Sequence, residues 1–168
     1  MNSIFKRRSI RQYEDKQITE EQIELLLKAA MSAPSACDTR PWEFIVILDK
    51  SVLNQIAEAH PHAKMVKHSN CAIVVCAKPE VQIGVSDGYF PQDCGAATQN
   101  ILLQACELGL GTVWCGVYPK TDRIADIRRI LHIPDEVIPF NVIAVGYAAT
   151  DPGPSNRYDE KRVHRNQW

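Results

Sequence analysis

The sequence predicts one domain of the α+β class, with three layers in which helices cover both faces of a mixed sheet. Four β-rich apolar runs alternate with segments of helical periodicity, a pattern typical of such layered domains. The chain has 168 residues, enough for one domain with a sizeable core. In addition, residues 91–108 form a helical pattern that is apolar around most of its circumference, which indicates a helix inside a core or between two subunits.

Composition excludes several classes of protein. The formal net charge is −1 and 45% of the residues are hydrophobic, which argues against a disordered chain and against nucleic acid as a partner. No apolar run reaches the roughly 18 residues that a membrane helix needs, and the N-terminus contains no apolar stretch typical of a signal peptide. Six cysteines occur without a CxxC pair, mostly among apolar residues. We therefore expect a cytoplasmic protein with reduced thiols and no membrane contact.

The N-terminal segment contains a cluster of basic residues. Lys6, Arg7, Arg8 and Arg11 lie within six positions, with Ser9 between them. Guanidinium groups beside a hydroxyl can hold a phosphate dianion through charge-assisted hydrogen bonds. A solvated basic arm is the alternative, although apolar residues interrupt the cluster and an acidic residue follows it.

The first long helix is marked by its own capping signals. Thr19 followed by Gln22 predicts a capping box at its start, and the helix should end before Pro34. A small and polar loop, PSACDTRPW, leads into an apolar run at 43–48, which we interpret as a buried strand.

The next third of the chain predicts a short helix and a second strand. Ser51 could cap a helix that runs through His60, and the apolar run 71–77 is typical of a buried strand. Between them, His60 and His62 could suggest a metal site, but no carboxylate or cysteine is placed to complete it, so we expect no metal. Residues 81–90 show no clear period and are expected to form a loop.

The central helix is the segment around which the chain is organised. Its first half, 94–98, carries little side-chain bulk, so another backbone could approach closely there. Gly109 is placed for a left-handed cap, and a β-rich run, 112–117, follows. Glycine inside a strand pattern, here Gly116, often marks the close approach of a ligand or another backbone. The polar residues of the helix share one narrow face: Asp93, Asn100, Gln104 and Glu107.

The last part of the chain predicts one helix, one strand and a tail. Thr121 opens a helix whose apolar residues share one face and which ends before Pro134, and 140–147 is typical of a strand. From Thr150 onward the chain is rich in proline and charge. Such a tail is usually disordered, yet it ends in Trp168, a residue that is rarely left in water.

Together these segments resemble the nitroreductase family of FMN-dependent oxidoreductases, in its short form. The motifs, in order, are RRSIR, PSACDTRPWEF, QDCGAATQNILLQACELGLGTVWCGVYP, NVIAVGY and a tail ending in VHRNQW. The resemblance spans essentially the whole chain. It implies the FMN-dependent nitroreductase-like fold with a mainly antiparallel sheet, as one domain over residues 1–168. It also implies a homodimer with two FMN molecules at the interface, on which residues 150–168 pack back as a C-terminal tail.

The resemblance also implies a set of flavin contacts. Segment 7–11 would surround the phosphate and the near edge of the flavin, and 34–36 would come from the partner subunit and pack on the ring. Backbone groups at 115–116 would meet the N5 and O4 edge, Lys64 would lie near N1 and O2, and Arg157 would return to the phosphate. The matched cofactor-binding positions are Arg7, Arg8, Ser9, Arg11, Pro34, Ser35, Ala36, Asp38, Lys64, Cys115, Gly116 and Arg157.

Three features depart from the family pattern. Asp38, Thr39 and Arg40 stand where the family commonly has Asn-x-Gln, and this bears on the substrate pocket. Ser155 stands where a lysine often precedes the tail arginine, so fewer basic groups share the phosphate. The chain also lacks the helical insertion that covers the pocket in longer members.

The resemblance implies that the chain passes two electrons from NADH or NADPH to a small oxidant, such as a nitroaromatic or a quinone, by a ping-pong mechanism. The flavin supplies the chemistry and the protein supplies position and charge, with Lys64 and Arg11 stabilising the reduced cofactor. No protein acid or base is required, so no catalytic residue is assigned. Two alternatives stay open: another flavin enzyme on this scaffold (a dehalogenase, a dehydrogenase or a flavin-consuming enzyme) and a flavin-binding protein without enzymatic activity.

Overall fold

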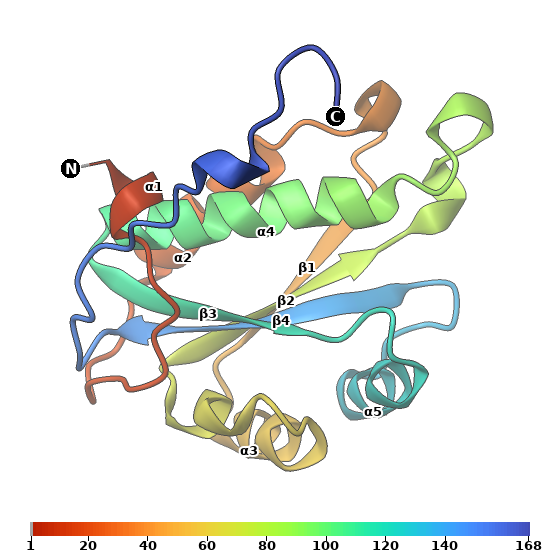
Figure 1. Ribbon diagram of the computed structural model, residues 1–168. Coiled ribbons are helices and arrows are strands. Elements are labelled where there is room, and N and C mark those ends of the chain that lie inside the picture. The colour runs from red at the N-terminus through yellow and green to blue at the C-terminus, as the bar shows by residue number, and fades with distance from the viewer. Residues whose placement is uncertain (1) are drawn as a thin grey trace.

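Four antiparallel strands form the centre of the molecule. The computed structural model describes residues 2–168. In the sheet the strands follow the order β1 (Trp42–Ile47), β2 (Cys71–Ala77), β4 (Ile138–Tyr147) and β3 (Leu110–Gly116), and each neighbouring pair is antiparallel (Figure 1). A parallel contact is made by an isolated bridge between Ser9 and Thr112. The expected mainly antiparallel sheet is confirmed, and β3 lies at its edge.

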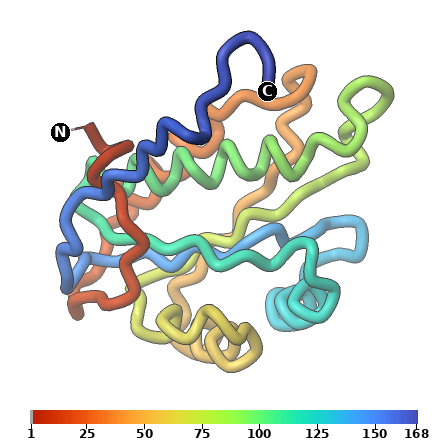
Figure 2. The backbone as a smooth tube through the Cα atoms, viewed as in Figure 1, coloured from red at the N-terminus to blue at the C-terminus, as the bar shows by residue number. Residues whose placement is uncertain are grey.

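Helices cover both faces of this sheet. Figures 1 and 2 show α1, α2 and α4 on one side and α3 and α5 on the other, so the three-layer arrangement is confirmed. Each side has its own core of buried residues. The helices are α1 (Ser3–Lys6), α2 (Glu20–Met31), α3 (Lys50–Ala59), α4 (Phe90–Glu107) and α5 (Thr121–Leu131). Short 3-10 turns are η1 (Ala36–Asp38), η2 (Lys64–His68), η3 (Pro79–Val81), η4 (Gly84–Ser86) and η5 (Glu160–Arg162).

Strand β2 explains why two cores form. All seven of its residues are buried, as its inner position in the sheet requires. Ile73 and Val75 belong to the core beneath α2 and α4, whereas Val74 and Cys76 belong to the core above α3 and α5. Because successive side chains of a strand point to opposite faces, one apolar run supplies both layers.

Most element boundaries agree with the predictions, with one corrected cap. The capping box of α2 is confirmed, since Gln22 N–H donates to Thr19 Oγ1 at 3.2 Å and Thr19 N–H donates to Gln22 Oε1 at 3.0 Å. The prediction that Ser51 caps α3 was wrong. The Asp49 carboxylate caps this helix by accepting from the Ser51 N–H at 2.7 Å, because an aspartate just before the first turn satisfies its free amides.

Helix α4 packs against α2 and the sheet, as its apolar circumference requires. Gly109 follows it with φ +72°, so the predicted left-handed cap is confirmed. A Cβ placed on Gly95 would lie 3.7 Å from the Trp114 indole. The half of α4 with small side chains, residues 94–98, therefore packs within this chain against a side chain of β3. We had expected another backbone to approach there.

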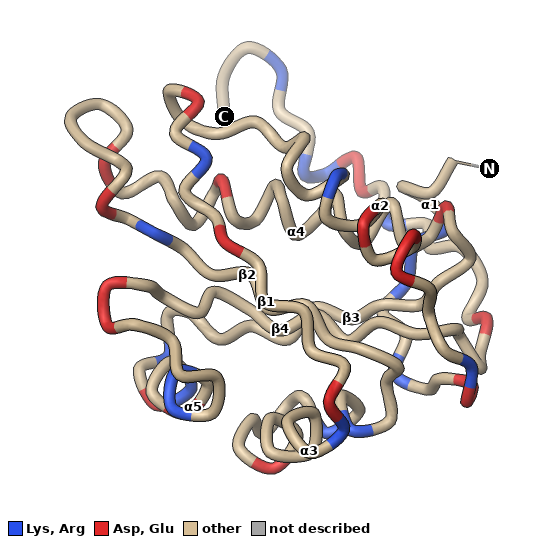
Figure 3. The backbone as a smooth tube through the Cα atoms, turned by 180° about the vertical axis from the view of Figure 1, so that it is seen from behind, with Lys and Arg blue, Asp and Glu red and all other residues tan. Residues whose placement is uncertain are grey.

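The surface carries both signs of charge. Figure 3 shows Lys and Arg interspersed with Asp and Glu over helices and loops, in keeping with the net charge of −1. Within residues 2–168, every helix is too short or too polar to cross a membrane.

Candidate functional site

The basic N-terminal segment lies along the free edge of β3. The Ile10 N–H donates to the Thr112 carbonyl at 2.9 Å, next to the bridge between Ser9 and Thr112. The fit is tight, because a Cβ on Gly111 would lie 2.8 Å from the Cβ of Ile10. Backbone pairing and the absent side chain of Gly111 thus hold residues 7–11 in one position. Their backbone is therefore a structured part of the fold, while the side chains of Ser9 and Arg11 are exposed.

A cavity of about 600 Å³ opens beside this segment. It lies between the N-terminal residues, the C-terminal end of α4, the start of β3 and residues 148–154. Three basic residues, Lys6, Arg7 and Arg8, line it together with one acid, Asp151. Arg8 also binds the tail, because its Nη1 donates to the Pro152 carbonyl at 2.9 Å and to the Gly153 carbonyl at 2.6 Å. The cavity can therefore take an anionic group, and the tail forms part of its boundary.

Gly116, the last residue of β3, has open space beside it. The Val117 N–H donates to the Phe140 carbonyl at 3.1 Å, and Gly116 pairs with Asn141. This pattern makes Gly116 and Asn141 a non-hydrogen-bonded pair, in which the N–H and C=O of Gly116 point away from β4. A Cβ on Gly116 would meet no atom of the described chain within 4 Å. The absent side chain leaves space that a ligand or a second chain can fill.

Two side chains hold the Gly116 carbonyl. His60 Nε2 lies 2.9 Å from this oxygen, and Arg123 Nη1 donates to it at 3.0 Å. His60 is buried at the end of α3, where Nδ1 accepts from the His62 N–H at 3.1 Å. From the sequence, His60 is only a weak metal candidate, and no feature of the sequence singles out Arg123. The one sequence feature that pointed to a role for His60 was its position at the expected end of a helix.

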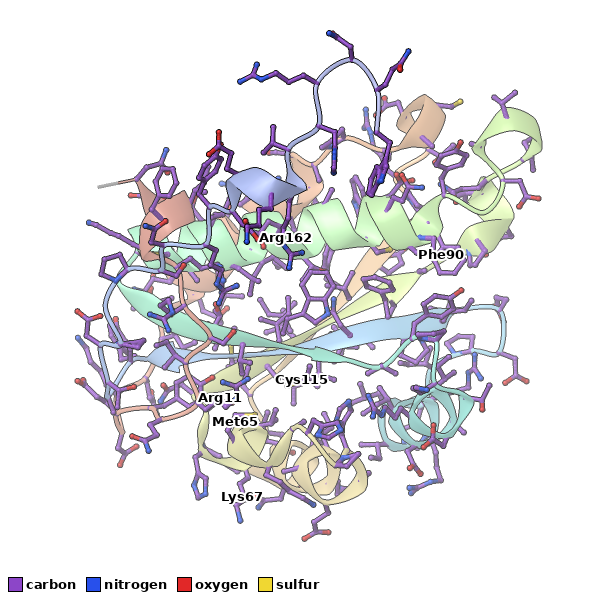
Figure 4. All side chains as sticks on the ribbon, viewed as in Figure 1. Arg11, Met65, Lys67, Phe90, Cys115 and Arg162 are labelled. Carbon is purple, nitrogen blue, oxygen red and sulfur yellow. The ribbon has the colours of Figure 1, made fainter. Side chains whose placement is uncertain are left out.

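Cys115, Met65 and Arg11 gather on the α3 side of β3, as Figure 4 shows. The Cys115 Sγ lies 3.9 Å from the Met65 Sδ and donates to the His62 carbonyl at 3.6 Å. Burial raises the pKa of the Cys115 thiol to about 11, against the opposing charge of Arg11. The thiol is therefore neutral near pH 7, and its side chain is a packing group. Lys64 is exposed at the start of η2, and its Nζ donates to the Glu58 carbonyl at 3.3 Å.

The loop 34–41 has an unusual backbone. Cys37, Asp38 and Arg40 have φ values of +51°, +54° and +50°, a region that non-glycine residues rarely adopt. Asp38 and Arg40 form an exposed ion pair at 2.5 Å. The hydrogen bond from Arg40 lowers the pKa of Asp38 below its usual value. The Asp38 carboxylate, expected at the flavin, is thus engaged by a neighbour in the same loop.

A buried carboxylate that sequence analysis assigned to a polar stripe anchors this loop. Asp93 Oδ1 accepts from the Ala36 N–H at 3.1 Å, and Oδ2 accepts from Gln82 Nε2 at 2.7 Å. Asp93 and Gln82 are both buried. The sequence feature that could have identified Asp93 as an anchor is its position as an acidic residue beside the small, apolar residues in the first half of the helix.

The predicted site residues fall into two separate groups within one chain. Segment 34–38 is fixed at Asp93, near the start of α4, whereas the basic cavity includes Cys106, near its end. These two positions are about 20 Å apart at 1.5 Å per helical residue. Arg7, Arg8 and Ser9 lie beside the start of β3, whereas Cys115 and Gly116 lie at its end, with Arg11 near Cys115. Pro34, Ser35, Ala36 and Asp38 lie near the start of α4, the half of the helix against which Trp114 of β3 also packs.

The tail extends away from the core. The Ser155 N–H donates to the Phe5 carbonyl at 3.4 Å, and Arg157 is exposed beyond it. Trp168 is fully exposed and stacks on His164 with ring centroids 4.4 Å apart. Within this chain, the expected packing of Trp168 on protein is therefore not made. The expectation that Trp168 packs on protein now requires a second copy of this chain to cover it.

Comparison with known proteins places this chain in a family of oxidoreductases. The model of the Nitroreductase family matches residues 4–147. The chain is 48% identical over 168 residues to a Methanothermobacter thermautotrophicus protein provisionally named NADH dehydrogenase/NAD(P)H nitroreductase, covering 100% of this chain and 87% of the relative. This chain belongs to the nitroreductase family.

Two solved structures share the fold over nearly the whole chain. One, named FMN-dependent nitroreductase, is from Clostridium difficile R20291, with a TM-score of 0.92, 32% identity and coverage of 99% of each chain. The other is a nitroreductase, provisionally named, in complex with FMN from Desulfovibrio desulfuricans. It has a TM-score of 0.83 and 28% identity, and the match covers 99% of this chain and 95% of that one.

Proposed function

We propose that this chain is an FMN-dependent oxidoreductase that passes two electrons from NADH or NADPH to a small oxidant, such as a nitroaromatic or a quinone, by a ping-pong mechanism. The observation that carries the proposal is the free edge of β3. There an ordered basic segment pairs with the strand at Thr112, an open glycine ends the strand, and the basic segment borders a cavity large enough for an anionic group. Relatives with this fold are named NAD(P)H nitroreductase and FMN-dependent nitroreductase.

The residues present fit FMN. Arg7 lines the cavity with its charge available to a phosphate, and no GxGxxG loop for a dinucleotide pyrophosphate occurs in the sequence. Gly116 offers a main-chain N–H that points away from β4, at a position where an added Cβ would meet no atom within 4 Å. When bound, FMN supplies the two-electron chemistry, and the protein supplies position and charge. Arg11, in the N-terminal segment, places a positive charge beside Cys115 of that strand.

The same geometry supports a homodimer. Segments 34–36 and 7–11 lie at opposite ends of α4, about 20 Å apart within one chain, and in a dimer the second copy supplies another pair of these segments for the same flavin. Large apolar side chains are also exposed on α1 and the tail: Phe5 is 58% exposed, Tyr158 78% and Trp168 101%. A second copy that covers these residues would remove them from water, and the tail 150–168 would then pack on the dimer.

The absorption spectrum of the purified protein, followed by steady-state kinetics, tests the proposal. We expect bound flavin, released by heat as FMN at one per chain, and oxidation of NADH or NADPH when a nitroaromatic or a quinone is present. Double-reciprocal plots should give parallel lines, because the nicotinamide product leaves before the oxidant binds. Released FAD, or a colourless protein that does not take up FMN, would contradict the cofactor assignment. Bound FMN without nicotinamide turnover would identify a flavin-binding protein, and intersecting lines would require a ternary complex.

A further inference from the structure

A closed cycle of hydrogen bonds, the Asp93 network, joins loop 34–41 to α4 and to the segment that precedes it. Asp93 Oδ2 accepts from Gln82 Nε2 at 2.7 Å, and the same nitrogen donates to Thr39 Oγ1 at 3.2 Å. Thr39 Oγ1 donates in turn to the Ala36 carbonyl at 2.9 Å, and the Ala36 N–H closes the cycle by donating to Asp93 Oδ1 at 3.1 Å. The network therefore binds the two peptide units on either side of the Ala36 Cα.

This network fixes the place of the loop, whereas hydrogen bonds inside the loop fix only its shape. Two backbone hydrogen bonds close a turn within residues 35–39 and reach nothing outside it. Within residues 2–168, every hydrogen bond that ties residues 35–39 to a residue outside the loop ends on Asp93 or Gln82. The left-handed backbone at Cys37 and Asp38 needs such support from its surroundings.

The carboxylate of Asp93 determines how the network is arranged. A carboxylate only accepts hydrogen bonds, so Gln82 must turn its amide nitrogen toward it. Gln82 Oε1 is then buried without a hydrogen-bond partner in the described part of the chain. Asp93 lies in the first turn of α4, where the free N–H groups and the helix dipole favour a negative charge. One acidic side chain thus orients both the amide of Gln82 and the backbone of Ala36.

We propose that Asp93 and Gln82 are positioning residues that hold segment 34–36 against the flavin ring. The inference rests on the proposed function, because the flavin ring is the group that this segment would contact. Pro34 is exposed and Ala36 is half-buried, while the N–H and the carbonyl of Ala36 are both bound within the protein. The segment therefore offers a proline ring and a methyl group, and apolar groups of this kind suit the face of an aromatic ligand.

The chain offers matched variants for this network. Asp93→Ala removes both acceptors. Asp93→Asn retains an acceptor for the Ala36 N–H, and Gln82 can turn its Oε1 to the new amide, so this change should rescue most of the effect. Asn100→Ala is the control, because it removes one hydrogen bond between α4 and α2, from Asn100 Nδ2 to the Ala29 carbonyl. Gln82→Leu opens the network from its other side and provides an independent test should Asp93→Ala not fold.

The readouts are the FMN dissociation constant from flavin fluorescence, the visible circular dichroism of bound FMN, and amide hydrogen exchange of residues 35–39. In Asp93→Ala we expect FMN binding weaker by roughly threefold to tenfold, the range that one net hydrogen bond supports. The dichroism should change, because these bands report the groups packed around the flavin ring. Exchange at 35–39 should become several-fold faster in the flavin-free protein. Asn100→Ala should lower the melting temperature but leave all three readouts unchanged, and Gln82→Leu should act in the same direction as Asp93→Ala.

Four results would overturn these statements. A wild-type protein that binds no FMN overturns the proposed function and this inference together. A wild type that binds FMN, beside an Asp93→Ala variant with unchanged affinity and dichroism, overturns only the positioning role. If Asp93→Asn is as impaired as Asp93→Ala, the acceptor for the Ala36 N–H is not the source of the effect and the inference fails. Equal losses in Asn100→Ala would trace the effect to the general stability of α4, and the inference again fails.

Discussion

The guanidinium Nη1 of Arg8 lies 2.6 Å from the carbonyl oxygen of Gly153, a residue 145 positions further along the chain. The same nitrogen also donates to the Pro152 carbonyl. A side chain that the sequence assigns to a phosphate therefore fixes the start of the tail. Because both lie at the wall of the basic cavity, the order of the tail and the shape of the cavity depend on the same contact.

Replacement of Arg8 should loosen the tail. In Arg8→Ala the carbonyls of Pro152 and Gly153 lose their donor, at a cost of about 1 kcal/mol for a partly exposed charged hydrogen bond. Amide hydrogen exchange of residues 153–156 in the flavin-free protein should become several-fold faster. The exchange rates in Arg8→Lys should lie between those of the wild type and Arg8→Ala, because an ammonium group can make only part of these hydrogen bonds. Unchanged exchange in Arg8→Ala would show that the tail is held by other contacts.

Arg7 and Lys6 should differ strongly in their effect on FMN. Arg7 is half-buried at the cavity wall, whereas Lys6 is exposed. A charge-assisted hydrogen bond to a desolvated phosphate is worth about 1.5–3 kcal/mol, so Arg7→Ala should weaken FMN binding by roughly tenfold to a hundredfold. Titration of the flavin-free protein with FMN measures this, with Lys6→Ala as the matched control. Equal losses from both changes would mean that the cluster acts only through diffuse charge.

Two glycines of β3 should respond in opposite ways to a methyl group. In Gly116→Ala the added Cβ meets no protein atom within 4 Å, so the fold should keep its stability while FMN affinity falls. In Gly111→Ala the added Cβ lies 2.8 Å from Ile10, so the N-terminal segment must shift and stability should fall by about 1–3 kcal/mol. Thermal melting and FMN titration of both variants separate the two effects. Full FMN affinity in Gly116→Ala would show that the cofactor does not use this space.

Stability should depend on pH through His60. Its pKa is lowered by burial and by Arg123 and His62, while its hydrogen bond to Gly116 opposes the shift. In the unfolded chain the pKa of histidine is about 6.5. Between this value and the lower pKa of His60 in the folded chain, the unfolded chain binds more protons than the folded one. Stability from the neutral ring is therefore present above about pH 6.5 and is lost as the pH falls through the folded pKa, by up to about 1.4 kcal/mol per pH unit.

Urea unfolding of the wild type and of His60→Gln at pH 7.5 and pH 5 measures this term. The other four histidines of the chain are common to both proteins. The stability of the wild type should therefore fall more steeply on acidification than that of His60→Gln. Equal losses of stability in the two proteins would mean that protonation of His60 does not destabilise the folded state.

Trp168 should matter only in an assembly. It is fully exposed in the single chain, so its removal costs nothing there. If a second copy buries it, Trp168→Ala should destabilise the dimer by on the order of 3 kcal/mol. The melting temperature and the dimer fraction in light scattering should then fall most at low protein concentration. A folded, flavin-loaded monomer of the wild type at micromolar concentration would contradict the dimer itself.

Local rules account for the parts of this fold that the sequence specifies by itself. The capping box at Thr19, the helix from Thr121 to Leu131 and the buried strand from Cys71 to Ala77 agree with the pattern, because caps and periodicity depend on neighbours within one or two turns. The basic segment and the motif of α4 and β3 likewise indicate the family. These features require no knowledge of which distant segments meet.

Tertiary structure decides the contacts that support the site. His60 reaches Gly116 over 56 positions, Asp93 holds Ala36 over 57, and Arg8 holds Gly153 over 145. In each pair a polar group must find a partner because folding removes it, wholly or in part, from water. Which partner is available depends on how the sheet and helices pack. Periodicity marks such residues as polar or apolar, and only the packed chain determines which carbonyl or amide each of them binds.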